Sequence, residues 1–218
     1  MAQNISDAAR NRGRPVMSDE EALAMRSHIA DCALQLFRQE GYAAISMRRL
    51  AEEAGCTVMT IYRYFARKID VLQALWVAVF NELFDKLDSI AAAETDPVRK
   101  LGAVAQGYVD FWLTNREHYF LVYMASGVTQ ADVRMLVDDK AVMARFRLIP
   151  DCLAAVVDNA DRELVNFKAE YLLCALNGIC HNLITISSYP WSAADRLVQE
   201  AIHGILASPV QASSSTSQ

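Results

Sequence analysis

Apolar residues recur along most of the chain at intervals of three and four positions, which is the period of an amphipathic α-helix. The pattern is clear over residues 20–40, where the apolar positions are Leu23, Ile29, Ala30, Ala33, Leu34 and Phe37. Gly41 follows, and glycine is favoured just after a helix because it adopts a left-handed conformation easily. The pattern therefore predicts a first helix that ends at Gly41.

Residues that start or break helices divide the rest of the chain. Four polar residues can serve as N-caps, because their side-chain oxygens accept hydrogen bonds from unpaired backbone N–H groups of a first helical turn. They are Ser46, Thr57, Asp96 and Asn115. We expect Pro150 to kink or break its helix. The expected helices cover residues 46–55, 57–65, 68–92, 96–114, 115–127, 130–158, 161–188 and 193–207.

These patterns predict an all-α protein of about nine helices, with no convincing strand and no repeat of 20 to 50 residues. Residues 1–19 are polar, contain the basic run RNRGRP and predict a flexible arm. A three-helix bundle follows over residues 20–67 and a larger helical bundle over residues 68–207. Residues 208–218 have the composition of a disordered tail.

Charge is distributed unevenly along the chain. The net charge of −5 argues against a protein that coats nucleic acid nonspecifically. Residues 1–75 hold ten Lys and Arg against nine Asp and Glu, whereas residues 76–218 hold eleven against seventeen. An anionic partner should therefore meet the N-terminal third.

Residues 171–194 contain no charged side chain and have the length of a membrane span. Polar groups such as Asn177 and His181 are costly in hydrocarbon, so we expect a helix buried in protein and no membrane contact. The N-terminus lacks the apolar run of a secretion signal. Five cysteines without a CxxC pair indicate reduced thiols. These features predict a cytoplasmic protein.

Two short helices joined by a glycine form a candidate helix-turn-helix motif over residues 46–65. Gly55 can supply the positive φ that the turn needs. The predicted inner faces are Leu50, Ala51 and Ala54 on the first helix, and Ile61 and Phe65 on the second. In such a motif the second helix lies in the major groove of DNA, with its N-terminal residues at the base edges.

The stretch ISMRRLAEEAGCTVMTIYRYFARKIDVL resembles the DNA-binding signature of the tetracycline-repressor (TetR) family of bacterial transcriptional regulators. The matching positions are Ser46, Ala51, Ala54, Gly55, Thr57, Thr60, Ile61, Tyr62, Tyr64, Phe65 and Lys68. The similarity covers about residues 20–72, and the RGRP sequence at residues 12–15 is also frequent in the family. The resemblance implies a sequence-specific DNA-binding transcriptional regulator.

The phosphate contacts that this resemblance implies are Ser46, Thr57, Tyr62 and Lys68, and the residues nearest base edges are Thr57, Val58, Thr60 and Arg63. Val58 departs from the family pattern, which often has a polar or basic residue there. It offers apolar contact alone, for example to a thymine methyl group. Arg12 and Arg14 could enter a neighbouring minor groove, or they belong to an untethered, solvated arm.

The chain has one helix-turn-helix motif, and such motifs usually bind DNA in pairs. We therefore expect a homodimer on a pseudo-palindromic operator in double-stranded DNA. The two C-terminal helices are the candidate dimer interface, because the uncharged run would be a large exposed patch in a monomer. A monomer with that run wholly internal is the alternative. In the TetR family the middle helices enclose a pocket for a small-molecule effector, although their aromatic residues also suit an ordinary core. The pocket candidates are Trp112, Tyr123, Asn177 and His181.

Cys174, Asn177 and His181 share one helical face, but zinc needs about four ligands, so we expect a buried polar network there and no metal.

The sequence has no P-loop, GxSxG, HExxH or GxGxxG motif, so we expect neither an enzyme nor a cofactor. We therefore expect a dimeric repressor that a small-molecule ligand releases from its operator. The alternative is a helical adaptor whose helix-turn-helix motif binds a protein.

Overall fold

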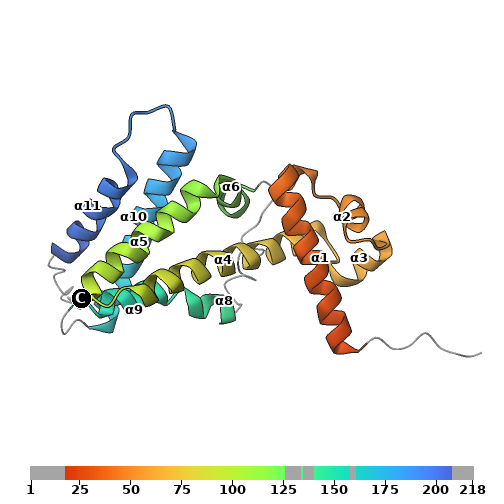
Figure 1. Cartoon of the computed structure of the whole chain (residues 1–218), viewed down its shortest axis with the longest axis horizontal. Helices are drawn as coiled ribbons and strands as arrows, with labels where there is room; N and C mark the ends of the chain where they lie inside the picture. Colours follow the sequence, from red (N-terminus) through yellow and green to blue (C-terminus); the bar gives the residue numbers. More distant parts are fainter. Residues whose placement is uncertain (1–17, 126–133, 135–139, 158–160, 208–218) are drawn as a thin grey trace, which may run out of the picture. The chain divides into compact units, whose positions relative to one another are not determined.

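A computed structural model of the chain describes residues 18–125, 134, 140–157 and 161–207, and all regular secondary structure in these residues is helical (Figure 1). The predicted all-α fold is thereby confirmed. The elements are α1 (Asp19–Glu40), the 3-10 helix η1 (Tyr42–Ala44), α2 (Met47–Glu53), α3 (Val58–Tyr64), α4 (Lys68–Ala93), α5 (Pro97–Thr114), α6 (Arg116–Tyr123), α8 (Lys140–Arg145), α9 (Leu148–Ala154), α10 (Arg162–Thr185) and α11 (Ala194–Ala207).

The chain divides into two compact units, Met1–Lys68 and Ile69–Gln218, with the boundary at the first residue of α4. The predicted basic arm, with Arg12 and Arg14, lies almost wholly outside the described residues, and the predicted tail lies wholly outside them. Within the described residues, no helix has the length and apolar character needed to cross a membrane.

The first unit has one apolar core, which α1, α2 and α3 share. Ser18 caps α1 in a capping box, in which Ser18 and Glu21 each accept a backbone N–H from the other. The buried apolar side chains are Ile29, Cys32, Ala33, Leu36, Phe37, Ile45, Leu50, Ala51, Ala54, Ile61 and Phe65. All five residues predicted for the inner faces of α2 and α3 are among them.

Two glycines with positive φ make the turns of this unit. Gly41 ends α1 with φ 78° and ψ 171°, so φ has the expected sign while ψ lies outside the left-handed helical region. Gly55 has φ 62° and turns the chain from α2 into α3. A side chain at either position would be strained because L-residues rarely adopt such angles.

In the second unit, α10 packs against α5, α9 and α11 (Figure 1). Gly107 on α5 lies against α4, where an added Cβ would come within 2.5 Å of Cδ1 of Ile90. A side chain at Gly107 would therefore displace the Ile90 side chain of α4. Trp76 of α4 donates its indole N–H to the carbonyl oxygen of Leu121 at 3.0 Å, which ties α4 to α6.

The described helices differ from the predicted ones at several places: η1 was not predicted, and α6 and α10 end at Tyr123 and Thr185 instead of near residues 127 and 188. Asn115 occupies the N-cap position of α6, yet its side chain makes no cap hydrogen bond and donates instead to the carbonyl oxygen of Phe111 at 2.9 Å. The side chain therefore closes the end of α5. The predicted helix over residues 130–158 lies partly outside the described residues, and its described part contains α8 and α9. Pro150 lies in the first turn of α9, where its missing N–H breaks no helical bond.

Candidate functional site

The helix-turn-helix candidate is built from α2 and α3, and each helix begins with a side-chain cap. Ser46 accepts a hydrogen bond from the backbone N–H of Arg49 at 3.1 Å. Thr57 accepts one from the N–H of Thr60, also at 3.1 Å. Both residues therefore act as caps, as their positions predict.

The outer face of α3 is rich in large exposed side chains. Tyr62 is 50 % exposed and Val58 is 39 % exposed. Met59, which the sequence reasoning did not single out, is 79 % exposed. Arg63 is exposed as well. Because Ile61 is fully buried, α3 presents one face to the core and an amphipathic face outward.

The hydroxyl groups of Thr57 and Thr60 lie 2.9 Å apart and share a hydrogen bond. One of the two hydroxyl protons is therefore used within the helix start. Of the predicted base-edge residues, Arg63 then retains the largest hydrogen-bonding capacity, because its guanidinium carries five N–H donors.

Arg26 of α1 holds the end of α3. Its guanidinium lies over the ring of Phe65, 4.3 Å from the ring centroid, and donates a hydrogen bond to the carbonyl oxygen of Tyr64. A charged group in this position satisfies a carbonyl at a helix C-terminus, where the helix dipole favours cations. The sequence reasoning missed Arg26, because nothing in the periodicity of α1 marks a contact 38 residues away.

Lys68 begins α4 and contacts η1. Its ammonium group lies over the ring of Tyr42 at 4.2 Å and donates to the Tyr42 carbonyl oxygen at 3.4 Å. Burial lowers the pKa of Lys68 from its ordinary value. The predicted phosphate contact is therefore a half-buried lysine fixed by an aromatic ring.

Arg49 differs from Arg63 because acidic side chains surround it. It pairs with Glu40 at 2.8 Å and with Glu53 at 3.1 Å. The hydrogen bond to Glu40 is the main cause that raises the pKa of Arg49. Two carboxylates more than offset its charge, so Arg49 is a structural link between α1 and α2.

In the second unit, three of the four predicted pocket residues, Trp112, Tyr123 and Asn177, contact a fifth residue, Tyr108. The Tyr108 hydroxyl donates to Oδ1 of Asn177 at 2.7 Å, and the Tyr123 hydroxyl lies 3.2 Å from that of Tyr108. Trp112 is fully buried, and its ring lies 5.5 Å from that of Tyr123. His181 is engaged separately, with Nδ1 3.2 Å from the Tyr119 hydroxyl.

Burial changes the acidity of this cluster. It raises the pKa of Tyr123 to about 12, although 41 % of that residue is exposed, and it raises the pKa of Tyr108 well above the ordinary value. Both phenols therefore stay protonated and act as hydrogen-bond donors or acceptors. Of the three residues predicted to form a buried polar network, Asn177 is half-buried and belongs to this cluster, whereas Cys174 and His181 are exposed. The prediction of a buried network is therefore wrong for those two residues, and the observed cluster comes from α5, α6 and α10.

A pocket of about 290 Å³ lies beside this cluster. Its apolar lining comes from α4, α5, α8, α9 and α10 and includes Phe84, Tyr108, Met143, Phe146, Ile149 and Leu173. Asn166 and Glu170 supply polar groups. A mostly apolar pocket with a few polar groups is typical of small-molecule sites. Tyr108 belongs to both the pocket and the polar cluster, whereas the four predicted residues are not in the lining.

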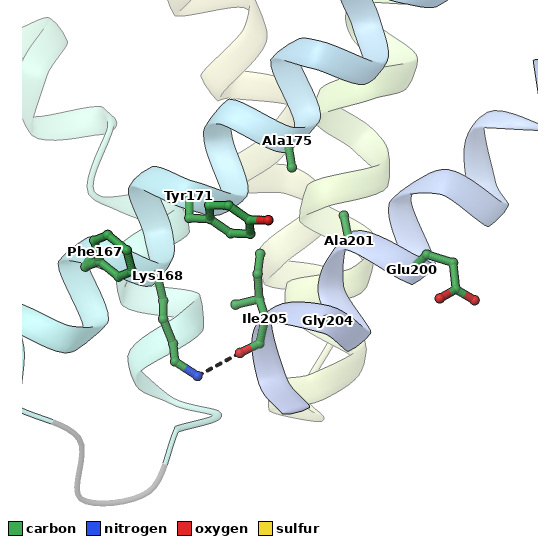
Figure 2. Close-up of a pocket in the computed structure, with 8 residues that line it drawn as sticks. All are labelled: Phe167, Lys168, Tyr171, Ala175, Glu200, Ala201, Gly204 and Ile205. Atoms are coloured by element: carbon green, nitrogen blue, oxygen red, sulfur yellow. Dashed lines mark hydrogen bonds between the residues drawn. The ribbon is translucent and has the colours of Figure 1, made fainter. Parts of the chain in front are cut away.

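A second hollow, of about 340 Å³, lies between α10 and α11 (Figure 2). Phe167 and Tyr171 extend from α10, and Ala201 and Gly204 of α11 face them. Lys168 is buried at its edge and donates to the carbonyl oxygen of Ile205 at 2.7 Å. The hollow is therefore lined by α10 and α11, the two helices that the sequence predicts to form the dimer interface.

The described residues contain no group of three or more His, Cys, Asp or Glu side chains arranged to hold a metal ion. Of the trio that shares a face of α10, Asn177 is bonded to the tyrosines and His181 to Tyr119. Cys174 is exposed. Two of the three residues therefore take part in hydrogen bonds with tyrosines.

Comparisons with known proteins agree with this architecture. The family model described as bacterial regulatory proteins, tetR family, matches residues 29–75, which contain α2, α3 and the turn between them. The chain is 27 % identical over 162 residues to the HTH-type transcriptional regulator HbdR of Aromatoleum sp. (strain CIB), covering 74 % of this chain and 69 % of HbdR. It is 33 % identical over 85 residues to the HTH-type transcriptional repressor KstR of Mycolicibacterium smegmatis, covering 39 % of this chain and 42 % of KstR.

Solved structures extend the likeness in fold to most of the chain. The fatty acid degradation regulator FadR from Bacillus halodurans superposes with a TM-score of 0.62 over 84 % of this chain and 95 % of that one, at 19 % identity. FadR from Bacillus subtilis, solved in complex with stearoyl-CoA, gives 0.63 over 83 % and 97 %, at 13 % identity.

Fold, motif and relatives together define a helix-turn-helix, DNA-binding transcriptional regulator. The helix-turn-helix region, residues 29–75, matches the TetR family, and the chain as a whole is similar to regulators of that type. This is a family of regulators and not of enzymes.

Proposed function

We propose that the chain is a dimeric, cytoplasmic repressor that binds a pseudo-palindromic operator through α3 and leaves it when a small molecule occupies the second unit. The observation that carries the proposal is the outer face of α3. Ile61 and Phe65 already pack this segment against the core of the first unit. Tyr62 and Arg63 are exposed, so they add little to that packing. Side chains of this kind suit the groove and backbone of DNA.

We assign the phosphate contacts to Ser46, Thr57, Tyr62 and Lys68, and the base-edge contacts to Thr57, Val58, Thr60 and Arg63. Lys68 suits its role because the Tyr42 ring fixes its ammonium group without neutralising it. The basic residues Arg12 and Arg14 would add contacts in the minor groove.

The exposed face of α10 supports a dimer. Its residues follow the spacing of a helix-packing stripe: Phe167, Tyr171, Cys174 and His181 are exposed, and Gly178 and Thr185 on the same stripe are half-buried. Tyr171 is 61 % exposed, and the hollow beside it is lined by the small residues Ala201 and Gly204 of α11. Large aromatic side chains next to small ones suit a partner helix that packs closely.

The pocket beside Tyr108 supports a ligand-responsive switch. Its walls include α8, α9 and α10, so a ligand inside would contact several helices at once. To act as a switch, the ligand must bind the DNA-competent and DNA-incompetent states with different affinity. The Bacillus subtilis FadR structure, solved in complex with stearoyl-CoA, is an example of a protein of this fold that binds a small molecule.

Selection of bound duplexes from a random pool, followed by mobility-shift titration over a series of salt concentrations, tests the DNA-binding part. We expect one pseudo-palindromic site, bound far more tightly than random duplex at each salt concentration. Light scattering should give the mass of a dimer, and Tyr171→Glu should shift it to that of a monomer. If no duplex sequence is enriched, the alternative function is favoured, in which the helix-turn-helix motif binds a protein.

A further inference from the structure

Met59 holds an unusual position on α3. Successive residues of an α-helix are turned by about 100°, so Met59 lies roughly 160° around the axis from the buried Ile61. Arg63 lies one turn further along on the same outward side. Met59 is 79 % exposed, which makes it the most exposed large apolar residue among those described. The side chain therefore contributes almost nothing to the core of the first unit.

Met59 is not an isolated surface residue. Val58 precedes it, and Tyr62 follows one turn later, at the spacing of neighbours on a helix surface. All three are exposed. Single apolar residues on a surface are common, but three on one face of a helix of seven residues form a patch. The patch lies on the helix that reads DNA in the proposed function.

The polar groups around this patch are partly used already. Thr57 accepts the N–H of Thr60, and the two hydroxyls share one hydrogen bond. The major groove displays one apolar group, the C5-methyl of thymine, besides its donors and acceptors. An outward Met or Val can contact that methyl and gains nothing from the polar edges of the other bases.

We propose that Met59, assisted by Val58, reads thymine methyl groups, so that each operator half-site contains one or two thymines whose methyl groups are required. Arg63 then reads a base edge by hydrogen bonds beside them. The proposal rests on the proposed DNA-binding function. It adds that some bases of the operator are recognised by apolar contacts.

Replacing single thymines by deoxyuridine in the selected operator tests this proposal, because the change removes one methyl group and keeps every hydrogen-bonding atom. Binding is measured by fluorescence anisotropy. Burying one methyl group is worth roughly 0.8 kcal/mol, so we expect a loss of about fourfold at one or two positions per half-site. Substitution at the remaining thymines should change affinity less than twofold.

Met59→Ala should abolish most of the deoxyuridine penalty, since the side chain that senses the methyl group is gone. Leu23→Ala is the matched control, because Leu23 is also an exposed apolar residue of the first unit but lies on α1. It should keep the full penalty. Thermal unfolding of both variants should match the original chain, as both side chains are exposed.

Two results would overturn the proposal: no thymine position sensitive to loss of its methyl group, or an equal penalty in Met59→Ala and the original chain. Either can occur while the operator is bound tightly, so the DNA-binding function would stand. If the selection gives no duplex at all, the proposed DNA-binding function is wrong, and so is this inference.

Discussion

The ammonium group of Lys68 lies over the ring of Tyr42, 4.2 Å from the ring centroid, and joins the first residue of α4 to η1. The same side chain is the proposed phosphate contact. A cation over an aromatic ring keeps its charge while its position is restricted. Packing and the proposed phosphate contact therefore involve the same residue.

Lys68→Ala should weaken binding to the operator and to random duplex by a similar factor, because a phosphate contact is blind to sequence. The slope of log affinity against log salt concentration should fall by about one unit per protomer. Tyr42→Leu is the control. It removes the ring but keeps the charge and the backbone carbonyl, so the salt slope should be retained while stability falls by about 0.5–2 kcal/mol. An unchanged slope in Lys68→Ala would refute the phosphate assignment.

Arg63→Ala should act differently from Lys68→Ala. If Arg63 donates to a base edge, its loss should cost about 1–3 kcal/mol on the operator and much less on random duplex. Competition titrations with both duplexes give this ratio. Arg63→Lys should restore little of the loss, since lysine lacks the planar fork that pairs with a guanine. Equal losses on both duplexes would place Arg63 on the backbone.

Sequence predicted those features of the fold that local chemistry determines. Ser46 and Thr57 cap helices because the residue types and the neighbouring N–H groups suffice. Ile61 and Phe65 are buried because their spacing places them on one face. The family signature rests on the same short stretch, which is why the helix-turn-helix motif could be recognised without coordinates.

Features that depend on distant contacts were not predicted. The bond from Arg26 to Tyr64, like that from Tyr108 to Asn177, joins residues far apart in the chain. Asn115 was expected to cap α6 and closes α5 instead, since two helix ends compete for one side chain. Met59 was overlooked because periodicity marks which residues face inward and gives no weight to an apolar residue that faces out.

Asn177→Leu should destabilise the second unit. The Asn177 amide oxygen accepts from Tyr108 at 2.7 Å and from Tyr123 at 3.3 Å, so leucine would leave a buried phenol short of a partner. Such a loss costs about 1–3 kcal/mol. Urea unfolding followed by circular dichroism measures it. Tyr123→Phe, which leaves the Tyr108–Asn177 bond intact, should cost clearly less, and an equal cost would show that the cluster is not centred on that bond.

Because its thiol is buried, Cys180 should make the free energy of unfolding fall at alkaline pH. The thiol is fully buried on α10, and burial raises its pKa from 9.0 to about 12. Above pH 9 the thiol therefore ionises in the unfolded chain but stays protonated in the folded one, which favours unfolding. For this group alone the free energy of unfolding should fall by about 1.4 kcal/mol between pH 7 and pH 10.

Cys180→Ala should reduce that decline by about 1.4 kcal/mol, whatever its effect on stability at pH 7. Urea unfolding in reducing buffer at pH 7, 9 and 10 measures it, below the range where the tyrosines of the unfolded chain are mostly ionised. Cys174→Ala is the matched control for the loss of a thiol, because Cys174 is exposed on the same helix. Parallel stability curves for Cys180→Ala and the original chain would show that the Cys180 thiol ionises equally in both states, against the burial seen in the structure.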